Sequence, residues 1–517
     1  MELKTNRESV PVAVYVPDIV QEQNIELDYI LPDYYPDIFR LVHCEVKPVV
    51  TGYSVSGDKI SYELRCDIRI LYCGEGGSLL QVVQQKQSFT KSAEIGRNCD
   101  NAEISVIPKT DHINFRAVNK RRLDMRGAVS VRIKISCDET KEVISDAEGM
   151  NIQLKKSPVQ FASKKLNAEK IVQINDEIEL SDTQPEAVNI ISVRCRADEC
   201  EHKLVSGKLL VKGTVTADIL YSCEQNGMNS AEPLSFDLAY SQIVDIDGID
   251  DSCICKVTPE ILCCDVSPVA DKNSENRLLS CETELRLVCK AVKTSSVMLV
   301  TDAFSTVYPC EAEYTEIRAE KIPISAIENF RHTAVLSTGE NTPDKVYSIW
   351  CSPKNINAHI TDDGKAVAVS GMLTYSTAEK DKNGNIVMPQ HDEAFEQIIE
   401  MADLSTEKPV SADVKIKDVS YNIGSDGNLT AVADISAEIL TCGAESIRVV
   451  SEISVDDSIR KKRDSDYAIK LYFSSGNEDI WDIAKRYSTS VNAILEENDI
   501  TGDTADENKM LLIPIVS

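Results

Sequence analysis

Three short stretches of the chain share one pattern: Pro36-Asp37-Ile38, Pro185-Glu186-Ala187-Val188 and Pro343-Asp344-Lys345-Val346. Each places an acidic residue directly after a proline and an apolar residue one or two positions later. The stretches recur about 150 residues apart, which is the size of a domain and far longer than the period of a solenoid repeat. The pattern therefore predicts three homologous domains in tandem.

Each stretch is followed by a glycine turn and then by a strand pattern that reaches a tyrosine. The turns and tyrosines are Gly57-Asp58-Lys59 with Tyr72, Gly207-Lys208 with Tyr221, and Gly364-Lys365 with Tyr375. Every copy also ends in an alternating apolar run, such as Val129, Val131, Ile133 and Ile135 in the first. Alternation with a period of two is typical of half-buried antiparallel strands, so we expect a mainly β protein with three tandem β-sandwich-like repeat domains.

The repeats and the charge pattern divide the chain into six segments. We expect an N-terminal arm over residues 1–28, β domains over 29–150, 151–295 and 296–453, a charged linker over 454–466 and a last domain over 467–517. The linker is predicted from a cluster of acidic and basic residues, which favours an exposed connection. The last domain is accordingly expected to be independent and tethered.

The last segment has a different pattern, in the order strand, helix, helix, strand. Its apolar residues alternate at Ile469 and Leu471, follow helical spacing at Ile480, Ile483, Ala484 and Tyr487 and again at Val491, Ile494 and Leu495, and end in a strand from Met510 to Ile513. Ser490 is a suitable N-cap for the second helix. We expect a small βααβ domain in which Trp481 belongs to the core.

This C-terminal segment resembles the LysM family. The matching strings are Ile480-Trp481-Asp482-Ile483-Ala484-Lys485-Arg486-Tyr487, Asn498-Asp499-Ile500 and Leu511-Leu512-Ile513-Pro514, in the order and spacing of the family. Asn477 and Asn508 stand where the family usually has glycine. Because asparagine tolerates a positive φ better than most residues, we expect the fold to persist.

The resemblance also implies a binding surface. In LysM domains a groove for N-acetylglucosamine lies between two loops, which correspond here to Asn477, Glu478, Asp479 and Ile480 and to Asp499, Ile500, Thr501 and Gly502. Acidic side chains suit an anionic wall polymer poorly, because like charges repel. We therefore expect these loops to contact a protein, with peptidoglycan or a chito-oligosaccharide as the alternative ligand.

Most of the chain resembles SipL-like spore morphogenesis proteins, whose repeats are called SPOCS domains. The resemblance rests on the proline-acidic starts, the strands that end in Tyr72 and Tyr221, and the segment Asp302-Ala303-Phe304-Ser305-Thr306-Val307-Tyr308-Pro309. It implies a non-enzymatic adaptor of spore coat assembly in the mother-cell cytoplasm. Its implied partner is stage IV sporulation protein A, a coat-basement ATPase at the forespore surface.

The composition agrees with a binding protein that does not contact nucleic acid. A net charge of −29 opposes binding to phosphate-rich surfaces. The sequence contains no run of eighteen apolar residues, and the stretch from Met1 to Glu8 is charged, so we expect neither a signal peptide nor membrane insertion. The alternative function is a cell-wall or cortex anchor that binds peptidoglycan.

The sequence offers no catalytic, cofactor or metal motif. None of the six histidines lies in a nucleophile motif, and no phosphate-binding glycine string occurs. Of the seventeen cysteines only Cys195 and Cys200 have a zinc-like spacing, and no second pair completes a ligand set. We expect reduced structural thiols, no metal, no cofactor and no enzyme activity.

Overall fold

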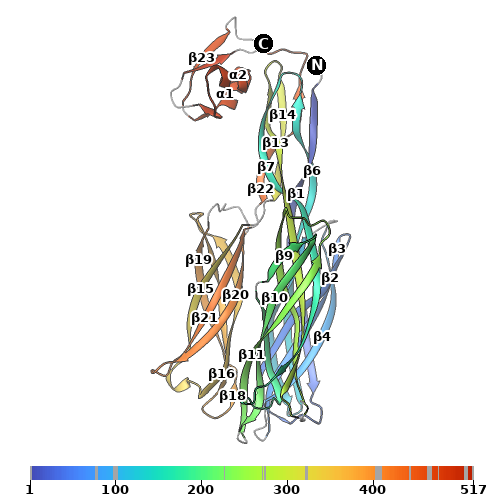
Figure 1. The fold of residues 1–517 in the computed structure, drawn as a ribbon, viewed down its shortest axis with the longest axis vertical. Coiled ribbons are helices and arrows are strands. Elements are labelled where there is room, and N and C mark those ends of the chain that lie inside the picture. The colour runs from blue at the N-terminus through green and yellow to red at the C-terminus, as the bar shows by residue number, and fades with distance from the viewer. Residues whose placement is uncertain are drawn as a thin grey trace.

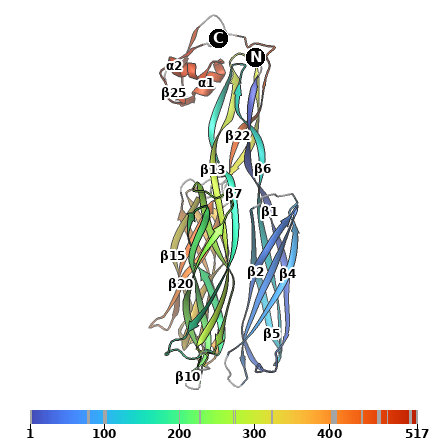
Figure 2. The same ribbon diagram turned by 45° about the vertical axis from the view of Figure 1, so that its right-hand side comes forward.

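The computed structural model describes residues 3–75, 80–96, 103–198, 200–225, 228–270, 272, 275–320, 324–401, 410–441, 444–462, 468–475, 477–505 and 510–514. Three β-sandwiches stand side by side, a narrow stalk rises from them, and a small domain with two helices lies at the far end of the stalk (Figures 1 and 2). The prediction of a mainly β protein with a small C-terminal domain is confirmed. In the described part of the chain, no helix is long and apolar enough to cross a membrane.

The first sandwich consists of two antiparallel three-stranded sheets. One sheet has the order β1 (Lys4–Ile30), β6 (Arg122–Glu148), β5 (Glu103–Asn119), and the other has the order β2 (Ile38–Ser56), β3 (Lys59–Gly74), β4 (Leu80–Glu94). Every second residue of the central strands points between the sheets, including Leu64 and Ile68 of β3 and Val131 and Ile133 of β6, all at most 2% exposed. The core therefore follows the period-two pattern of the sequence.

The second and third sandwiches repeat this arrangement. The second pairs β12 (Cys253–Val269), β13 (Leu278–Ser305) and β7 (Ile152–Glu179) against β11 (Met228–Asp245), β10 (Lys208–Gln225), β8 (Asn189–Ala197) and β9 (Glu201–Val205). The third pairs β15 (Ile324–Ser337), β21 (Leu429–Thr441) and β20 (Val410–Ile423) against β16 (Lys345–Ile360), β17 (Ala366–Lys380), β18 (Ile386–Val387) and β19 (Gln390–Glu400). The three predicted repeats thus share one topology.

The proline and the tyrosine that mark each repeat meet in space in the first two sandwiches. The Tyr72 hydroxyl donates to the Pro36 carbonyl at 3.1 Å, and the Tyr221 hydroxyl donates to the Pro185 carbonyl at 3.3 Å. In the third sandwich the Tyr375 hydroxyl donates instead to the carbonyl of His332, at 3.2 Å. The third copy, in which the glycine turn at Gly364 lies closer to its tyrosine than in the other two, has therefore changed this contact.

The stalk consists of three two-stranded ribbons, one from each repeat. Strands β1, β6, β7 and β13 run on beyond their sandwiches, and the third ribbon is the pair β14 (Cys310–Glu320) and β22 (Ala444–Val455). We define the stalk as residues 4–16, 137–148, 152–163, 294–305, 310–320 and 444–455. All six strands contribute to one apolar cluster inside it: Val10, Val12, Val143, Val159, Phe161, Leu299, Ile317 and Val449.

A β-bulge recurs at the same place in each ribbon. The unpaired residues are Ser145, Thr301 and Ser451, and the two residues before each of them are fully buried, namely Val143 and Ile144, Leu299 and Val300, and Val449 and Val450. A bulge interrupts the alternation of side chains, which allows two consecutive residues to face the interior. The second residue of each pair lies in a further apolar cluster at the stalk tip.

Two predicted connectors differ from what the sequence indicated. The segment predicted as an arm, residues 1–28, lies almost wholly in β1, which pairs with β6 along its length. In the predicted linker, the Asp456 amide donates to the Pro309 carbonyl at 3.0 Å and the Lys461 amide to the Val307 carbonyl at 2.9 Å. Arg463 to Asp466 of that linker lie outside the described residues. The remaining domain boundaries stay predictions.

Each sandwich contacts both of the others. Lys86 and Asp265 join the first to the second at 2.8 Å, and the Arg194 guanidinium lies 3.5 Å from the centre of the Trp350 ring between the second and third. Arg40 of the first donates to the Ile386 carbonyl of the third at 3.0 Å. Together with the shared stalk, these contacts make the three repeats one structural body.

Candidate functional site: the small C-terminal domain and its contact with the stalk

The small domain has the predicted βααβ order. Strand β23 (Ile469–Phe473) pairs with β26 (Met510–Pro514), and the short strands β24 (Glu478–Asp479) and β25 (Thr504–Ala505) pair beside the helices α1 (Ile480–Tyr487) and α2 (Val491–Glu497). The buried members of its core are Ile480, Trp481, Ile483, Ala484, Ile494, Ala505, Leu511 and Ile513, together with Phe304 from the stalk. The core is therefore completed by another part of the chain.

Capping residues fix the ends of the helices. The Asp479 carboxylate accepts a hydrogen bond from the Trp481 amide at 2.8 Å, and the Ser490 hydroxyl accepts from the Ala493 amide at 3.1 Å, as the sequence predicts for Ser490. Asn477 has a φ of 49°, so asparagine does adopt the conformation for which the family usually has glycine. Asn508 lies outside the described residues.

Asn498 connects the second helix to the closing strand. Its side-chain amide donates to the carbonyls of Ile494 at 2.8 Å and Leu512 at 2.7 Å, and its side-chain oxygen accepts from the Leu512 amide at 2.7 Å. With its hydrogen-bonding groups used in this way, Asn498 is a structural residue. It sets the position at which the loop from Asp499 to Gly502 begins.

The eight predicted contact residues lie in two neighbouring loops, because the pairing of β24 with β25 brings the loops together. Asn477, Asp499, Thr501 and Gly502 are exposed, Glu478, Asp479 and Ile500 are partly buried, and Ile480 is only 1% exposed. The Ile480 side chain faces the core, and its amide donates to the Asp503 carbonyl at 2.8 Å. Its side chain is therefore not part of the surface that a ligand meets.

The acidic residues of the first loop have partners within the protein. Glu478 accepts hydrogen bonds from the Tyr472 hydroxyl at 2.8 Å and from the Ser475 amide at 3.1 Å. The bond from Tyr472, followed by that from Ser475, lowers the pKa of Glu478 below its ordinary value. Asp479 forms an ion pair with Lys155 of β7 in addition to its capping bond. These two carboxylates therefore stabilise the conformation of the loop in addition to giving it negative charge.

The outer face of the β23–β26 sheet is apolar and exposed. Ile469, Leu471 and Phe473 are 44%, 63% and 68% exposed, and Met510, opposite Phe473, is 49% exposed. Alternate residues of β23 point away from the helices, so this outer face is separate from the domain core. Contiguous apolar side chains at a surface commonly mark a site of protein contact.

Trp481 lies between the small domain and the stalk. Its indole N–H donates to the Asp302 carboxylate of β13 at 2.8 Å, and its ring meets Phe304 edge to face, with centroids 4.9 Å apart. Lys485 of α1 also donates to both oxygens of Asp302, at 2.8 and 2.7 Å. Trp481 is 6% exposed and so is buried as predicted, although no sequence pattern indicates that the stalk covers it. The predicted tethered domain is thus packed against the stalk.

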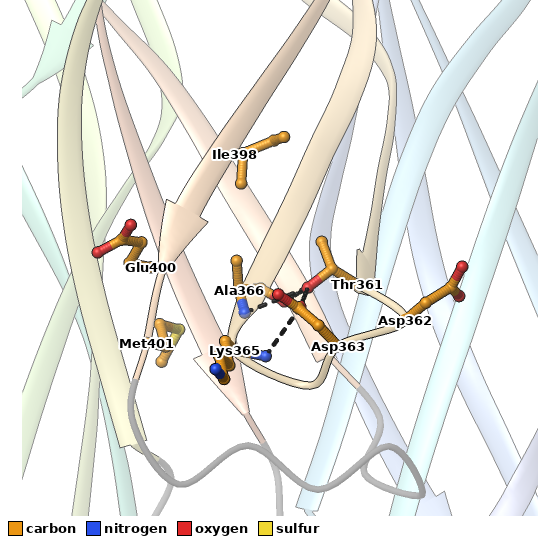
Figure 3. Close-up of a pocket in the computed structure, with 8 residues that line it drawn as sticks. All are labelled: Thr361, Asp362, Asp363, Lys365, Ala366, Ile398, Glu400 and Met401. Carbon is orange, nitrogen blue, oxygen red and sulfur yellow. Dashed lines mark hydrogen bonds between the residues drawn. The ribbon is translucent and has the colours of Figure 1, made fainter.

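An open pocket on the third sandwich does not look like a ligand site. It is lined by Thr361, Asp362, Asp363, Lys365, Ala366, Ile398, Glu400 and Met401 (Figure 3). Two of its polar side chains bond within the turn: the Thr361 hydroxyl donates to Asp363 at 2.6 Å, and Asp363 accepts from the Lys365 amide at 3.2 Å. These bonds stabilise the turn between β16 and β17, which accounts for the arrangement without a ligand.

The cysteines follow the prediction with one exception. The fourteen free thiols of the described residues include Cys195, Cys200, Cys281 and Cys289, whereas Cys137 is disulfide-bonded. The expectation of reduced thiols is therefore wrong for Cys137. Burial raises the pKa of the Cys289 thiol to about 11, which keeps it protonated and unreactive near neutral pH. Within the described ranges, no group of three or more His, Cys, Asp or Glu residues is placed to hold a metal ion.

The fold and the site define a multi-domain β protein that ends in a LysM-type module. A family model described as "SipL, SPOCS domain" matches residues 167–269, from within β7 to the end of β12, and one described as "LysM domain" matches residues 477–514. The resemblance to SipL-like proteins with a LysM domain is confirmed by these two matches. We found no curated protein and no solved structure that matches the chain.

These matches give the protein a general role. The SPOCS domain indicates a sporulation protein, and the LysM domain indicates a module of the kind that binds peptidoglycan or chito-oligosaccharide. Both matched domains belong to families of binding or adaptor domains.

Proposed function

We propose that this protein is a non-enzymatic adaptor of spore coat assembly. In the proposal it acts in the mother-cell cytoplasm and at the forespore surface, where its LysM domain binds a coat-basement ATPase like stage IV sporulation protein A. The observation that carries a protein contact is the exposed apolar face of Ile469, Leu471, Phe473 and Met510. Burial of such a face against another protein is favourable, because it removes apolar area from water.

The first predicted loop follows β23 along the chain, and in the proposal the two loops form the polar part of the contact. Asn477, Asp499, Thr501 and Gly502 are exposed and are available to a partner. An apolar centre with a polar rim is the usual composition of a protein interface, in which the centre contributes most of the affinity. In this proposal the loops supply specificity and the sheet face supplies most of the affinity.

Charge reversal at Glu478 and Asp479, the two acidic residues of the first loop, would disturb the fold as well as the surface. Asp479 caps α1 and pairs with Lys155, and Glu478 holds Tyr472. Loss of the cap alone costs about 0.5–2 kcal/mol. A test of partner binding therefore needs residues whose side chains have no structural role.

Phe473→Ser in the full-length protein provides that test. We expect affinity for the purified ATPase, measured by biolayer interferometry, to fall at least about tenfold, since an exposed aromatic at an interface centre is a frequent hot spot. Ile398→Ser, which replaces a 60% exposed apolar residue of the third sandwich, is the matched control and should bind normally. Unchanged binding by Phe473→Ser, with an unchanged melting temperature, would remove the sheet face from the proposal.

Glycan binding is the second candidate, favoured by the LysM match over residues 477–514. Thr501→Lys changes the exposed second loop without altering the sheet face. If the glycan function holds, this variant loses chito-oligosaccharide binding in calorimetry and retains ATPase binding. If the adaptor function alone holds, the unmodified protein shows no heat of binding with chito-oligosaccharide or soluble peptidoglycan fragments.

A further inference from the structure

The stalk tip carries three equivalent positions, and the LysM domain occupies one of them. After the three bulges the chain continues as Asp146-Ala147-Glu148, Asp302-Ala303-Phe304 and Glu452-Ile453-Ser454. The middle residues of these triplets are buried in the same apolar cluster. Asp146 and Asp302 also accept the same local bond from the following alanine amide, at 2.9 and 2.8 Å. The backbone at these two positions is therefore alike, and the side chains around it differ.

We propose that Asp302 and Phe304 form an intramolecular binding site for helix α1 of the LysM domain, which holds that domain in one orientation on the stalk. The inference goes beyond the proposed function and does not depend on the identity of any external partner. It assigns a role to the segment Asp302 to Pro309, for which neither domain match accounts.

Asp302 is the polar centre of this binding site. Its carboxylate accepts hydrogen bonds from the Trp481 indole N–H at 2.8 Å, from the Lys485 ammonium at 2.7 Å and from the Tyr314 hydroxyl at 2.7 Å. The carboxylate side chain is only 19% exposed. Hydrogen bonds to a charged group in a partly buried place are stronger than neutral ones, and they also fix geometry.

The equivalent position of the first ribbon cannot serve in the same way. Asp146 is 40% exposed and pairs with Lys156 of the neighbouring strand β7 at 2.8 Å, so its carboxylate is engaged within the stalk. The residue two positions later is Glu148 instead of Phe304. A carboxylate in place of the phenyl ring would lose the edge-to-face contact with the indole. The docking site is thus distinguished by one aromatic residue and by an aspartate whose ion pair is with the LysM domain, whereas that of Asp146 is with a stalk lysine.

Two further contacts hold the ends of α1. At its N-terminus Asp479 pairs with Lys155 of β7. At its C-terminus the Lys461 ammonium donates to the Ser305 carbonyl at 2.7 Å and to the Ser488 hydroxyl at 3.3 Å. With Asp302 and Phe304 in between, α1 is attached at three separated places. Three separated contacts fix both the position of the LysM domain on the stalk and its rotation about the axis of α1.

This orientation determines which surfaces remain available. Trp481 and Asp479 face the stalk, whereas the sheet face of Leu471 and Phe473 and the loop of Asp499 and Thr501 stay exposed. The docked LysM domain therefore presents those exposed surfaces at the end of a rigid stalk. A partner that needed Trp481 would have to displace Asp302 first.

The indole N–H of Trp481 reports directly on this contact. The chain has two tryptophans, so a ¹⁵N-tryptophan-labelled full-length sample gives two indole signals, and the loss of one of them in Trp481→Phe assigns both. We expect Asp302→Ala to raise the solvent exchange rate of the Trp481 indole about tenfold or more, which corresponds to the loss of a charge-assisted hydrogen bond. Asp146→Ala, which removes the same local alanine bond, should leave that rate unchanged.

Lys485→Ala removes a contact from the LysM side and leaves the stalk intact. It should also raise the Trp481 exchange rate, and the double variant with Asp302→Ala should add little, because both changes release the same contact. The Trp350 indole, buried between the sandwiches, shows that the body stays folded. Unchanged exchange in Asp302→Ala, or fully additive effects in the double variant, would overturn the proposal.

Discussion

The hydroxyl of Tyr72 donates a hydrogen bond to the backbone carbonyl of Pro36 at 3.1 Å, and so joins the two residues that mark the first repeat. Tyr72 is fully buried, and Pro36 lies in the connection between β1 and β2. The bond therefore holds that connection against the central strand of the opposite sheet. The same relation in the second repeat shows that it belongs to the repeated unit.

Tyr72→Phe should destabilise the protein by about 1 kcal/mol, since it removes this hydrogen bond and keeps the ring in place. Urea unfolding followed by circular dichroism measures the change. Tyr34→Phe, at an 80% exposed position of the same connection, is the control and should have no effect. Equal stability of Tyr72→Phe and the unmodified protein would mean that the hydrogen bond makes no net contribution to the free energy of unfolding.

The repeats and their strands were predictable because their signals are local. Alternating apolar residues, as in Val129, Val131 and Ile133, mark strands wherever one face is buried, and the proline and tyrosine lie 36 positions apart in each of the first two repeats. The LysM domain was predictable for the same reason, since its strings lie within about forty residues. The strands within one repeat and the elements of the LysM domain could therefore be predicted from the sequence.

The stalk and the docked LysM domain were not predictable, because they depend on contacts between repeats. Alternation looks the same in a sandwich and in a ribbon, so the sequence could not tell where β13 leaves its sandwich. The partners Asp302 and Trp481 are 179 positions apart, and neither belongs to a periodic pattern that points to the other. At the repeated bulges the hydroxyl residues Ser145, Thr301 and Ser451 each stand between two apolar residues and an acidic residue, and this short pattern does not by itself indicate a bulge.

Leu299→Ala should lower the free energy of unfolding by about 2–4 kcal/mol. Leu299 is fully buried in the stalk cluster to which all six stalk strands contribute, and removing its side chain leaves a cavity. Its neighbour Met298 is 48% exposed, so Met298→Ala is a matched control and should cost well under 1 kcal/mol. Denaturant unfolding compares the two. A similar small cost for both variants would show that the stalk interior is not tightly packed.

Trp481→Ala should cost about 3–5 kcal/mol, because it empties a large part of a small core and also removes the contact with Phe304. Hydrogen exchange of β26 in the full-length protein should rise sharply while exchange in the sandwiches stays unchanged. Leu471→Ala, on the exposed sheet face, should leave β26 protected. A Trp481→Ala protein with normal protection in β26 would show that the indole is dispensable to the core.

The docking contact should weaken in acid. Burial by itself raises the pKa of Asp302, but hydrogen bonds from Lys485, Trp481 and Tyr314 outweigh burial and leave the pKa below the ordinary value of 3.8. Tyr314 does not change its protonation state in this pH range, since burial, together with its bond to Asp302, raises its pKa to about 12. When the LysM domain leaves the stalk, Asp302 loses two of its donors and binds a proton more readily. The released state therefore takes up protons, and docking loses stability as the pH falls.

The sign of this linkage sets the expected titration of the Trp481 indole signal. A carboxylate with a lowered pKa contributes its full stabilisation above pH 3.8 and loses it as the pH falls through the lowered value. The signal should thus stay constant from about pH 7 to pH 5 and move toward its Asp302→Ala position only below pH 3.8. In Lys485→Ala the transition should begin at a higher pH, because the hydrogen bond that lowers the pKa of Asp302 most, that from the Lys485 ammonium, is gone. A change that begins already between about pH 7 and pH 5 would assign the contact to a group other than Asp302.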